Sequence, residues 1–236
     1  MSKLQGRVAI VTGASSGIGR GIALAFANEG AIVVVADIRE EPLRGKYHET
    51  NHRPPTAEQI LANGGSALYL QTDVSSIQQI ERMIKTTILR FGKLDILVNN
   101  AGIGVVSEID SQTDKEWDDL IGINLRAPFI ATRLSIPHLQ ASSHGRIINV
   151  ASVHAFGGGA GPGYASSKAA LVNMTRDAAI TLGPDQITVN AICPGYIETP
   201  IQDYLSLQQI DSVRNRTPLP RLGKPSDVAG AAIYFA

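Results

Sequence analysis

Tyr164 and Lys168 lie four residues apart in the segment YASSK and could together move a proton. Residues at positions i and i+4 share one face of a helix, so the spacing predicts an ammonium group beside the phenol. A free tyrosine titrates at about pH 10. An ammonium about 4 Å away contributes up to ~4 kcal/mol at an effective dielectric constant of about 20, or roughly three pKa units. We therefore expect a general acid or base with a pKa near neutrality, although an exposed tyrosine beside a solvated lysine also fits the pair.

Two further polar residues are candidates for the same chemistry. Ser152 follows a predicted strand at 147–150, and Asn124 continues the helical stripe of Trp117 and Leu120. An inward asparagine must find hydrogen-bond partners or cost a few kcal/mol. Carbonyls of its own helix would satisfy it; alternatively, Asn124 anchors a water or a proton relay.

A glycine-rich turn, TGASSGIG at residues 12–19, follows the first predicted strand and opens a helical pattern. Its glycines, Gly13, Gly17 and Gly19, let the backbone approach a pyrophosphate, whose charge the first helical amides would meet. The spacing is G-x-x-x-G-x-G, which differs from the general dinucleotide fingerprint G-x-G-x-x-G. The turn therefore predicts a phosphate site, against the alternative of a turn without a ligand.

Asp37 ends the second predicted strand, 18 residues beyond Gly19. An acidic residue about 20 positions after the glycines binds ribose hydroxyls in dinucleotide folds. A solvated carboxylate at a strand end is the alternative. The turn and the acid together favour a dinucleotide site.

Short apolar runs rich in valine and isoleucine recur along the chain, at 8–11, 32–36, 68–70, 96–98, 147–150 and 187–192. They do not alternate with polar residues, which is typical of parallel strands buried on both faces. Segments with helical periodicity lie between these runs. Ser75 and Ser76 are candidate N-caps of one predicted helix, and Thr113 and Glu116 form a capping-box pattern at the start of another. We predict a doubly wound α/β parallel sheet with helices on both faces, a Rossmann fold, as one domain over residues 1–236.

The composition excludes several classes of protein. Of 236 residues, 44% are hydrophobic and 18% charged, which is typical of a globular protein. Lys+Arg and Asp+Glu number 21 each, so no excess of positive charge would hold a nucleic acid. Cys193 is the only cysteine, which excludes an internal disulfide and a thiolate cluster. The start lacks the apolar core of a secretory signal, and no run approaches the ~18 apolar residues of a membrane span. We expect a cytoplasmic protein that binds neither membrane nor nucleic acid.

His48 and His52 frame the segment HETNH, which matches the zinc motif H-E-x-x-H. That motif requires both histidines on one face of a firm helix. Here two poor helix formers lie between them and two prolines follow closely, so we interpret the match as coincidence and predict no metal. The polar stretch 39–56 that contains it is predicted to be an extended loop. Its basic residues are either solvated or touch the cofactor or a neighbouring subunit: Arg44, Lys46 and Arg53.

Seven motifs, in order, resemble those of the short-chain dehydrogenase/reductase family, and they cover nearly all of residues 4–236. They are TGASSGIG at 12–19, Asp73-Val74, NNAG at 99–102, INLRAPF around Asn124, INVASV around Ser152, YASSK at 164–168 and Pro194-Gly195. The resemblance implies an oxidoreductase that transfers a hydride between NAD(P)(H) and a secondary alcohol or ketone. It also implies a nicotinamide over the carboxyl ends of the strands.

The resemblance assigns roles to these residues. Ser152 would hold the substrate oxygen, Tyr164 would transfer its proton, and Lys168 would bind the nicotinamide ribose and lower the pKa of the tyrosine. Asn124 would complete a proton relay through water. The segment 197–213 would close over the substrate. The cofactor-binding residues implied are Gly13, Ser15, Ser16, Gly17, Ile18, Gly19, Asp37, Asp73, Val74, Asn100, Ala101, Gly102, Tyr164, Lys168, Pro194, Gly195, Ile197 and Thr199.

Cofactor preference and assembly follow from the same resemblance. Relatives that prefer NADP usually carry a basic residue before the middle glycine or after the strand-end acid, where this chain has Ser16 and Ile38. The Asp37 carboxylate would also repel a 2′-phosphate. We expect NAD in preference to NADP, a small alcohol or ketone as substrate, and a homo-oligomer, either tetramer or dimer.

The chain departs from the family pattern in three places. Twelve residues, rather than thirteen, lead from Ser152 to Tyr164, and this stretch is glycine-rich. The connection 39–56 is long, and the family's last strand is missing, so the sheet has one strand fewer or the chain is truncated. The remaining alternatives are a relative that binds nucleotide without catalysis, a scaffold, or a module that needs a partner chain. The expected substrate pocket comprises the segments 102–106, 153–163 and 196–213.

Overall fold

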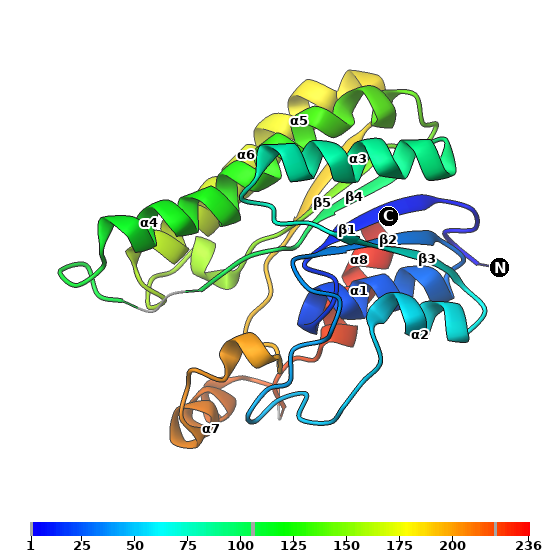
Figure 1. Ribbon diagram of the computed structural model, residues 1–236. Coiled ribbons are helices and arrows are strands. Elements are labelled where there is room, and N and C mark those ends of the chain that lie inside the picture. Colours follow the sequence, from blue (N-terminus) through cyan, green and yellow to red (C-terminus); the bar gives the residue numbers. More distant parts are fainter. Residues whose placement is uncertain (1, 105–106, 220) are drawn as a thin grey trace.

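The computed structural model describes residues 2–104, 107–219 and 221–236. Within these residues, one sheet of six parallel strands has the order β3-β2-β1-β4-β5-β6 (Figure 1). The strands are β1 Val8–Thr12, β2 Ile32–Asp37, β3 Ser66–Gln71, β4 Ile96–Asn99, β5 Arg146–Val150 and β6 Thr188–Ile192. The chain starts at the middle of the sheet and winds outward to each edge in turn, which is the doubly wound order. The predicted Rossmann fold is confirmed.

Helices cover both faces of this sheet (Figure 1). One face carries α1 (Gly17–Asn28), α2 (Thr56–Ala62) and α8 (Pro225–Phe235), and the other carries α3 (Ile77–Phe91), α5 (Ala127–Gln140) and α6 (Pro162–Leu182). Each layer buries its own apolar cluster, with Ile22 and Phe26 in the first and Ile80 and Leu139 in the second. Among the helices that the structure describes, none combines the length and apolar character needed to cross a bilayer.

The strands differ in burial according to their place in the sheet. Every residue of the central strands β1 and β4 is buried, as their unalternated apolar runs predict. Strands β3 and β6 are only partly buried, because they form the two edges and each pairs with a single neighbour. Burial on both faces is therefore confirmed for the central strands and wrong for β3 and β6.

Two predicted helix starts are confirmed. Ser76 caps α3 through its side chain. Thr113 and Glu116 form the capping box of α4 (Asp114–Ile121), in which the Thr113 amide donates to the Glu116 carboxylate at 2.9 Å. Such boxes satisfy amides that lack partners within the helix. Trp117, predicted to face inward with Leu120, is instead 40% exposed, because α4 extends past the end of the sheet (Figure 1).

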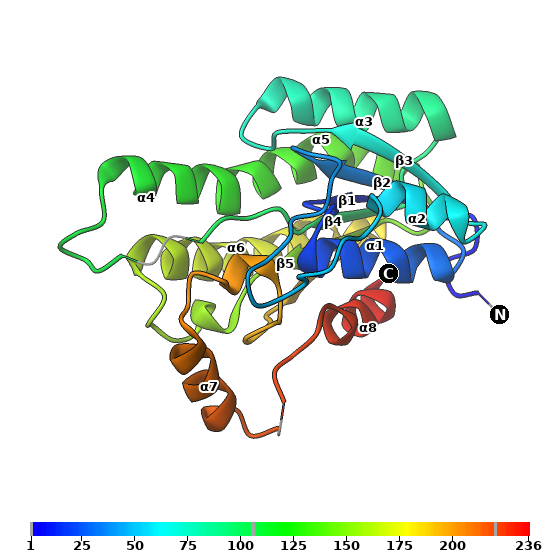
Figure 2. The ribbon, with the colours of Figure 1, turned by 60° about the horizontal axis from the view of Figure 1, so that its bottom comes forward.

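Long connections follow the carboxyl ends of β2, β4, β5 and β6, whereas β1 and β3 lead through short turns into α1 and α3. The segment between β2 and α2 runs beside the segment that follows β6, which includes a 3₁₀ turn (Pro200–Gln202) and α7 (Leu207–Arg216) (Figure 2). In open α/β sheets, ligands bind at this edge, where the strand order reverses. Here the reversal lies between β1 and β4, so these connections border the predicted site.

Candidate active site

The four predicted catalytic residues come from three elements beside the carboxyl edge. Ser152 lies two residues beyond β5 and precedes a 3₁₀ turn, Val153–Ala155. Tyr164 and Lys168 lie in the first two turns of α6, and Asn124 lies in a π-helical turn, Gly122–Arg126, between α4 and α5. π-Helical turns are rare in proteins, and those that occur frequently lie at functional sites. All four belong to elements that border the end of β5.

Ser152 is buried and lies near Tyr164. Its Oγ accepts a hydrogen bond from the His154 amide at 3.2 Å, which fixes the turn after β5. Burial raises the pKa of Tyr164, and the nearby Ser152 side chain opposes this by favouring the phenolate. The His154 ring lies edge-on to the Tyr164 ring, with centroids 6.3 Å apart. Serine and tyrosine therefore present neighbouring hydroxyl groups.

The expected pKa of Tyr164 is wrong for the ligand-free protein. Burial raises the pKa of Tyr164 above its ordinary value, the nearby Ser152 side chain opposes this, and the nearby Tyr204 adds to it. Lys168 Nζ lies 5.7 Å from the centroid of the phenol ring. The i, i+4 spacing thus brings the two side chains together, but burial is the largest influence on the pKa of the tyrosine and raises it.

Lys168 is a buried amine, 5% exposed, whose Nζ donates a hydrogen bond to the Val150 carbonyl at 3.0 Å. Burial lowers the pKa of Lys168 to about 8, and interaction with Cys193 partly counteracts this. Among the described residues, one carbonyl accepts from Nζ, so an ammonium group keeps further donors for another ligand. Burial therefore disfavours the ammonium form of Lys168, and its remaining donors can bind an acceptor.

Asn124 points inward, as its stripe predicts, and is completely buried. Its Oδ1 accepts from the Ile103 amide at 2.9 Å, and its Nδ2 donates to the Ile103 carbonyl at 3.0 Å and to Ser167 Oγ at 3.2 Å. The carbonyls of its own helix are therefore not what satisfies it. Asn124 instead ties the chain after β4 to α6 directly beside Lys168. Ser167, which completes this link, lies within YASSK but was not predicted as a site residue.

The glycine-rich turn is held open by Thr12 and Asn100. The Asn100 and Ala101 amides each donate to Thr12 Oγ1 at 3.0 Å. Asn100 Nδ2 donates to the carbonyl oxygens of Thr12 and Gly13 at 2.8 and 3.1 Å. Gly13 has φ +64°, and a Cβ there would lie 2.9 Å from Ala101 Cα, so only glycine fits. Asn100, predicted near the ribose, here braces the turn.

Asp37 lies beside the same turn. Its Oδ2 accepts from the Ser15 amide at 3.0 Å, and Ser15 Oγ donates to the Arg39 carbonyl at 2.7 Å. Ser16 Oγ accepts from the Leu43 amide at 2.6 Å. The strand-end acid and the glycine-rich turn are thus adjacent, as a dinucleotide site requires.

The other predicted cofactor residues surround this edge. Asp73 Oδ1 accepts from the Ser75 amide and hydroxyl at 2.9 and 2.7 Å, which shapes the turn before α3. A Cβ on Gly102 would lie 3.1 Å from Asn124 Oδ1, so this glycine lies against the predicted catalytic asparagine. Half-buried Ile18 and Val74 pack on the two apolar clusters. The chain after β6 contributes the remaining residues: Pro194, Gly195, Ile197 and Thr199. Of the expected pocket segments, Val105 and Val106 lie outside the described residues.

The structure adds one contact that the sequence did not predict. Glu49 Oε2 accepts a hydrogen bond from the Gly17 amide, the first amide of α1, at 3.3 Å. The HETNH segment is not helical: His48 is buried, with Nε2 3.0 Å from the Tyr196 hydroxyl, whereas His52 is exposed. Among the described residues, no three His, Cys, Asp or Glu side chains form a group that could hold a metal.

The residues of this edge fit a dinucleotide. The Glu49 carboxylate on the Gly17 amide demonstrates that the glycine-rich turn accepts an anionic oxygen, as a helix N-terminus should. Lys168 has donors to spare among the described residues, and the Ser152 and Tyr164 hydroxyl groups lie on the far side of the reversal point. A phosphate on Gly17 requires that Glu49 move away.

Comparison with known sequences gives a consistent result. The family model described as short chain dehydrogenase matches residues 7–210. The (2S)-[(R)-hydroxy(phenyl)methyl]succinyl-CoA dehydrogenase subunit BbsD of Thauera aromatica is 38% identical over 233 residues, which cover 99% of this chain and 90% of that protein. The 3-oxoacyl-[acyl-carrier-protein] reductase FabG of Thermotoga maritima is 35% identical, with 99% and 92% covered.

Solved structures are similar over the whole chain. A short-chain dehydrogenase/reductase from Burkholderia xenovorans has a TM-score of 0.89 at 31% identity, covering 100% of this chain and 91% of that one. An NAD(P)-dependent gluconate 5-dehydrogenase from Beutenbergia cavernae, with NADP bound at low occupancy, has a TM-score of 0.88 at 31% identity, covering 99% and 90%.

Proposed function

Because the chain belongs to the short-chain dehydrogenase family, we propose that it transfers a hydride between NAD(H) and a secondary alcohol or ketone. The placement of Tyr164 and buried Lys168 in the first turns of α6, with buried Ser152 just beyond β5, carries the proposal. Its relatives include an oxoacyl-[acyl-carrier-protein] reductase and an NAD(P)-dependent gluconate 5-dehydrogenase, which supports an oxidoreductase reaction here.

Each residue of the proposed site has its own role in the reaction. Ser152 donates a hydrogen bond to the substrate oxygen and orients it beside the phenol, while Tyr164 gives that oxygen a proton in reduction and removes it in oxidation. Lys168 lies against the tyrosine and binds the ribose next to the nicotinamide. Asn124 and Ser167 hold the chain after β4 beside Lys168, where a relay to solvent would begin. The bound dinucleotide supplies or accepts the hydride.

The glycine-rich turn and Asp37 give the strongest support for dinucleotide binding. The first amides of α1 bind the pyrophosphate, and Asp37 binds the adenosine ribose. We further propose a cytoplasmic, single-domain homo-oligomer, which rests on the family alone.

A cofactor-reduction screen tests the proposal. Purified protein is incubated with secondary alcohols, sugars and hydroxy acids plus NAD or NADP, and with the corresponding ketones plus NADH or NADPH, while absorbance of the reduced nicotinamide is followed. We expect turnover with at least one pair. Binding of reduced cofactor without turnover across the screen would favour a non-catalytic nucleotide-binding protein.

We expect NAD to be used at least about tenfold more efficiently than NADP, because Asp37 would face the 2′-phosphate. A charge pair 4 Å apart costs about 1 kcal/mol in water and about 4 kcal/mol at an effective dielectric constant of 20, and about 1.4 kcal/mol equals a factor of ten. Values of kcat/KM for both cofactors provide the measurement.

Asp37→Asn is the informative variant, since the amide oxygen can still accept from the Ser15 amide while the charge is gone. It should narrow the difference between the two cofactors. Preference for NADP in the unaltered protein, or an unchanged ratio in Asp37→Asn, would refute the role of this carboxylate.

A further inference from the structure

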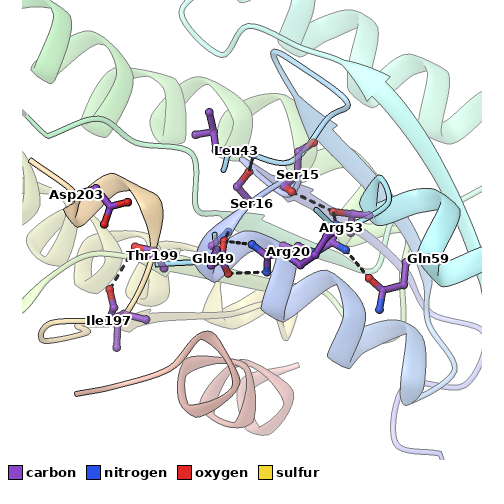
Figure 3. A network of polar contacts seen from close by, with 12 residues as sticks. Ser15, Ser16, Arg20, Leu43, Glu49, Arg53, Gln59, Ile197, Thr199 and Asp203 are labelled. Carbon is purple, nitrogen blue, oxygen red and sulfur yellow. Dashed lines mark hydrogen bonds and ion pairs between the residues drawn. The ribbon is translucent and has the colours of Figure 1, made fainter. Parts of the chain in front are cut away.

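The segment 39–55, here called the strap, crosses the mouth of the proposed cofactor site. It leaves the end of β2, passes the glycine-rich turn and returns to α2 (Figure 3). Its first part is bound to the turn through the Leu43 amide on Ser16 Oγ at 2.6 Å and the Arg39 carbonyl on Ser15 Oγ at 2.7 Å. The strap therefore touches the same serines that a dinucleotide would approach.

Glu49 is the part of the strap that reaches the helix N-terminus. Its carboxylate accepts from the Gly17 amide at 3.3 Å and pairs with both terminal nitrogens of Arg53, at 2.9 and 2.5 Å. The Glu49 side chain is only 11% exposed, so the contact is largely shielded from water. Glu49 has φ +53°, a left-handed conformation that residues other than glycine rarely adopt. The chain thus accepts an unfavourable backbone angle where it brings this carboxylate to the turn.

The strap is fastened at a second place, on the segment that follows β6. The Lys46 and Tyr47 amides donate to Asp203 Oδ2 at 2.5 and 3.2 Å, and His48 Nε2 lies 3.0 Å from the Tyr196 hydroxyl. Burial, with the Asp203 charge adding to it, raises the pKa of Tyr196 to about 12, so its hydroxyl stays protonated. These contacts, here called the clasp, connect the strap to the segment 197–213, which the family resemblance places over the substrate.

We propose that Glu49 is an internal competitor for the cofactor phosphate at the Gly17 amide, and that the strap must release it before a dinucleotide binds. The proposal rests on the proposed function, because it assumes a dinucleotide at this turn. A carboxylate and a phosphate cannot share one amide, and their like charges repel at short range. If the free protein is about ten times more often closed than open, the apparent dissociation constant is roughly tenfold weaker than that of the open form. Glu49 would then set cofactor affinity.

Glu49→Gln tests this competition, because it removes the charge and keeps the size. Glu41→Gln is the matched control: it makes the same charge change on the strap at an exposed residue. Direct titration with NADH and NADPH, followed by nicotinamide fluorescence in the absence of substrate, should give a dissociation constant about tenfold lower for Glu49→Gln. Glu41→Gln should match the unaltered protein. Equal affinity in all three proteins would overturn the proposal while leaving the proposed function intact.

A second variant and a second measurement test whether the clasp holds the strap closed. Asp203→Ala removes the acceptor of the Lys46 and Tyr47 amides, so it should also tighten NADH binding, which keeps the test valid should Glu49→Gln not fold. In the unaltered protein, NADH should increase amide hydrogen exchange at the Lys46 and Tyr47 amides. Slower exchange there on binding would overturn strap release. Absence of binding by NADH and NADPH in every variant would instead refute the proposed function, and the competitor with it.

Discussion

Tyr164→Phe is expected to lower turnover by about two to four orders of magnitude while leaving the affinity for NADH nearly unchanged. The variant keeps the ring, its packing and its edge contact with His154, and removes only the hydroxyl that exchanges a proton with the substrate. Loss of a group that acts in the transition state lowers kcat and kcat/KM together and spares cofactor binding. Steady-state kinetics with the best substrate of the screen, together with NADH titration, provide the measurement.

Tyr234→Phe is the control for this experiment. Tyr234 lies in α8 and is 84% exposed, so the same atom is removed far from the buried site. Its turnover should equal that of the unaltered protein. Near-normal turnover in Tyr164→Phe would contradict the assignment, and the proton would have to come from another group.

The pH profile should follow from the environment of Tyr164. In the ligand-free protein burial keeps the pKa of this phenol above its ordinary value. A base that must be deprotonated for alcohol oxidation then gains activity as pH rises, whereas ketone reduction needs the protonated form. We therefore expect oxidation to favour alkaline conditions and reduction to persist toward neutral pH. Initial rates in both directions across a pH series provide the measurement, and oxidation that is already maximal at neutral pH would contradict it.

Lys168→Met should have two opposite effects. Turnover and cofactor affinity should both fall, since one side chain serves the tyrosine and the ribose. Stability of the ligand-free protein at pH 7 should rise, because burial disfavours the ammonium and lowers its pKa from 10.5 to about 8. At about 1.4 kcal/mol per pKa unit, the relief is at most about 3 kcal/mol, less about 1 kcal/mol for the lost hydrogen bond to Val150.

The stability gained by Lys168→Met depends on pH. Between pH 8 and 10.5 the unfolded chain holds the lysine proton that the folded chain has released, so stability of the unaltered protein rises with pH in that window. The advantage of Lys168→Met in the free energy of unfolding should therefore be largest below pH 8 and shrink toward pH 10. Thermal unfolding of both proteins from pH 7 to pH 10 measures it. A variant less stable than the unaltered protein at pH 7 would contradict burial of an ammonium.

The strands and most helix starts could be predicted because their signals are local. An unalternated run of valine and isoleucine, such as the one in β1, must be buried on both faces, and a capping box such as Thr113 with Glu116 satisfies its own amides. Trp117 was misjudged because periodicity shows which residues share a helix face but not how far that helix extends past its neighbours. The edge strands β3 and β6 were misjudged for a similar reason, since order within a sheet is a tertiary property.

The sequence alone thus predicted the sheet and the glycine-rich turn with Asp37, because residue types at short spacings give these signals. It predicted Ser152, Tyr164, Lys168 and Asn124 as one site through motifs that resemble those of the family. Only the tertiary structure decided how deeply these two side chains, Lys168 and Tyr164, are buried, which lowers the pKa of Lys168 to about 8 and raises the pKa of Tyr164. It alone brought Glu49 to the Gly17 amide, 32 residues away in sequence, because the path of an irregular loop is set by the surfaces it meets and not by any period in its residues.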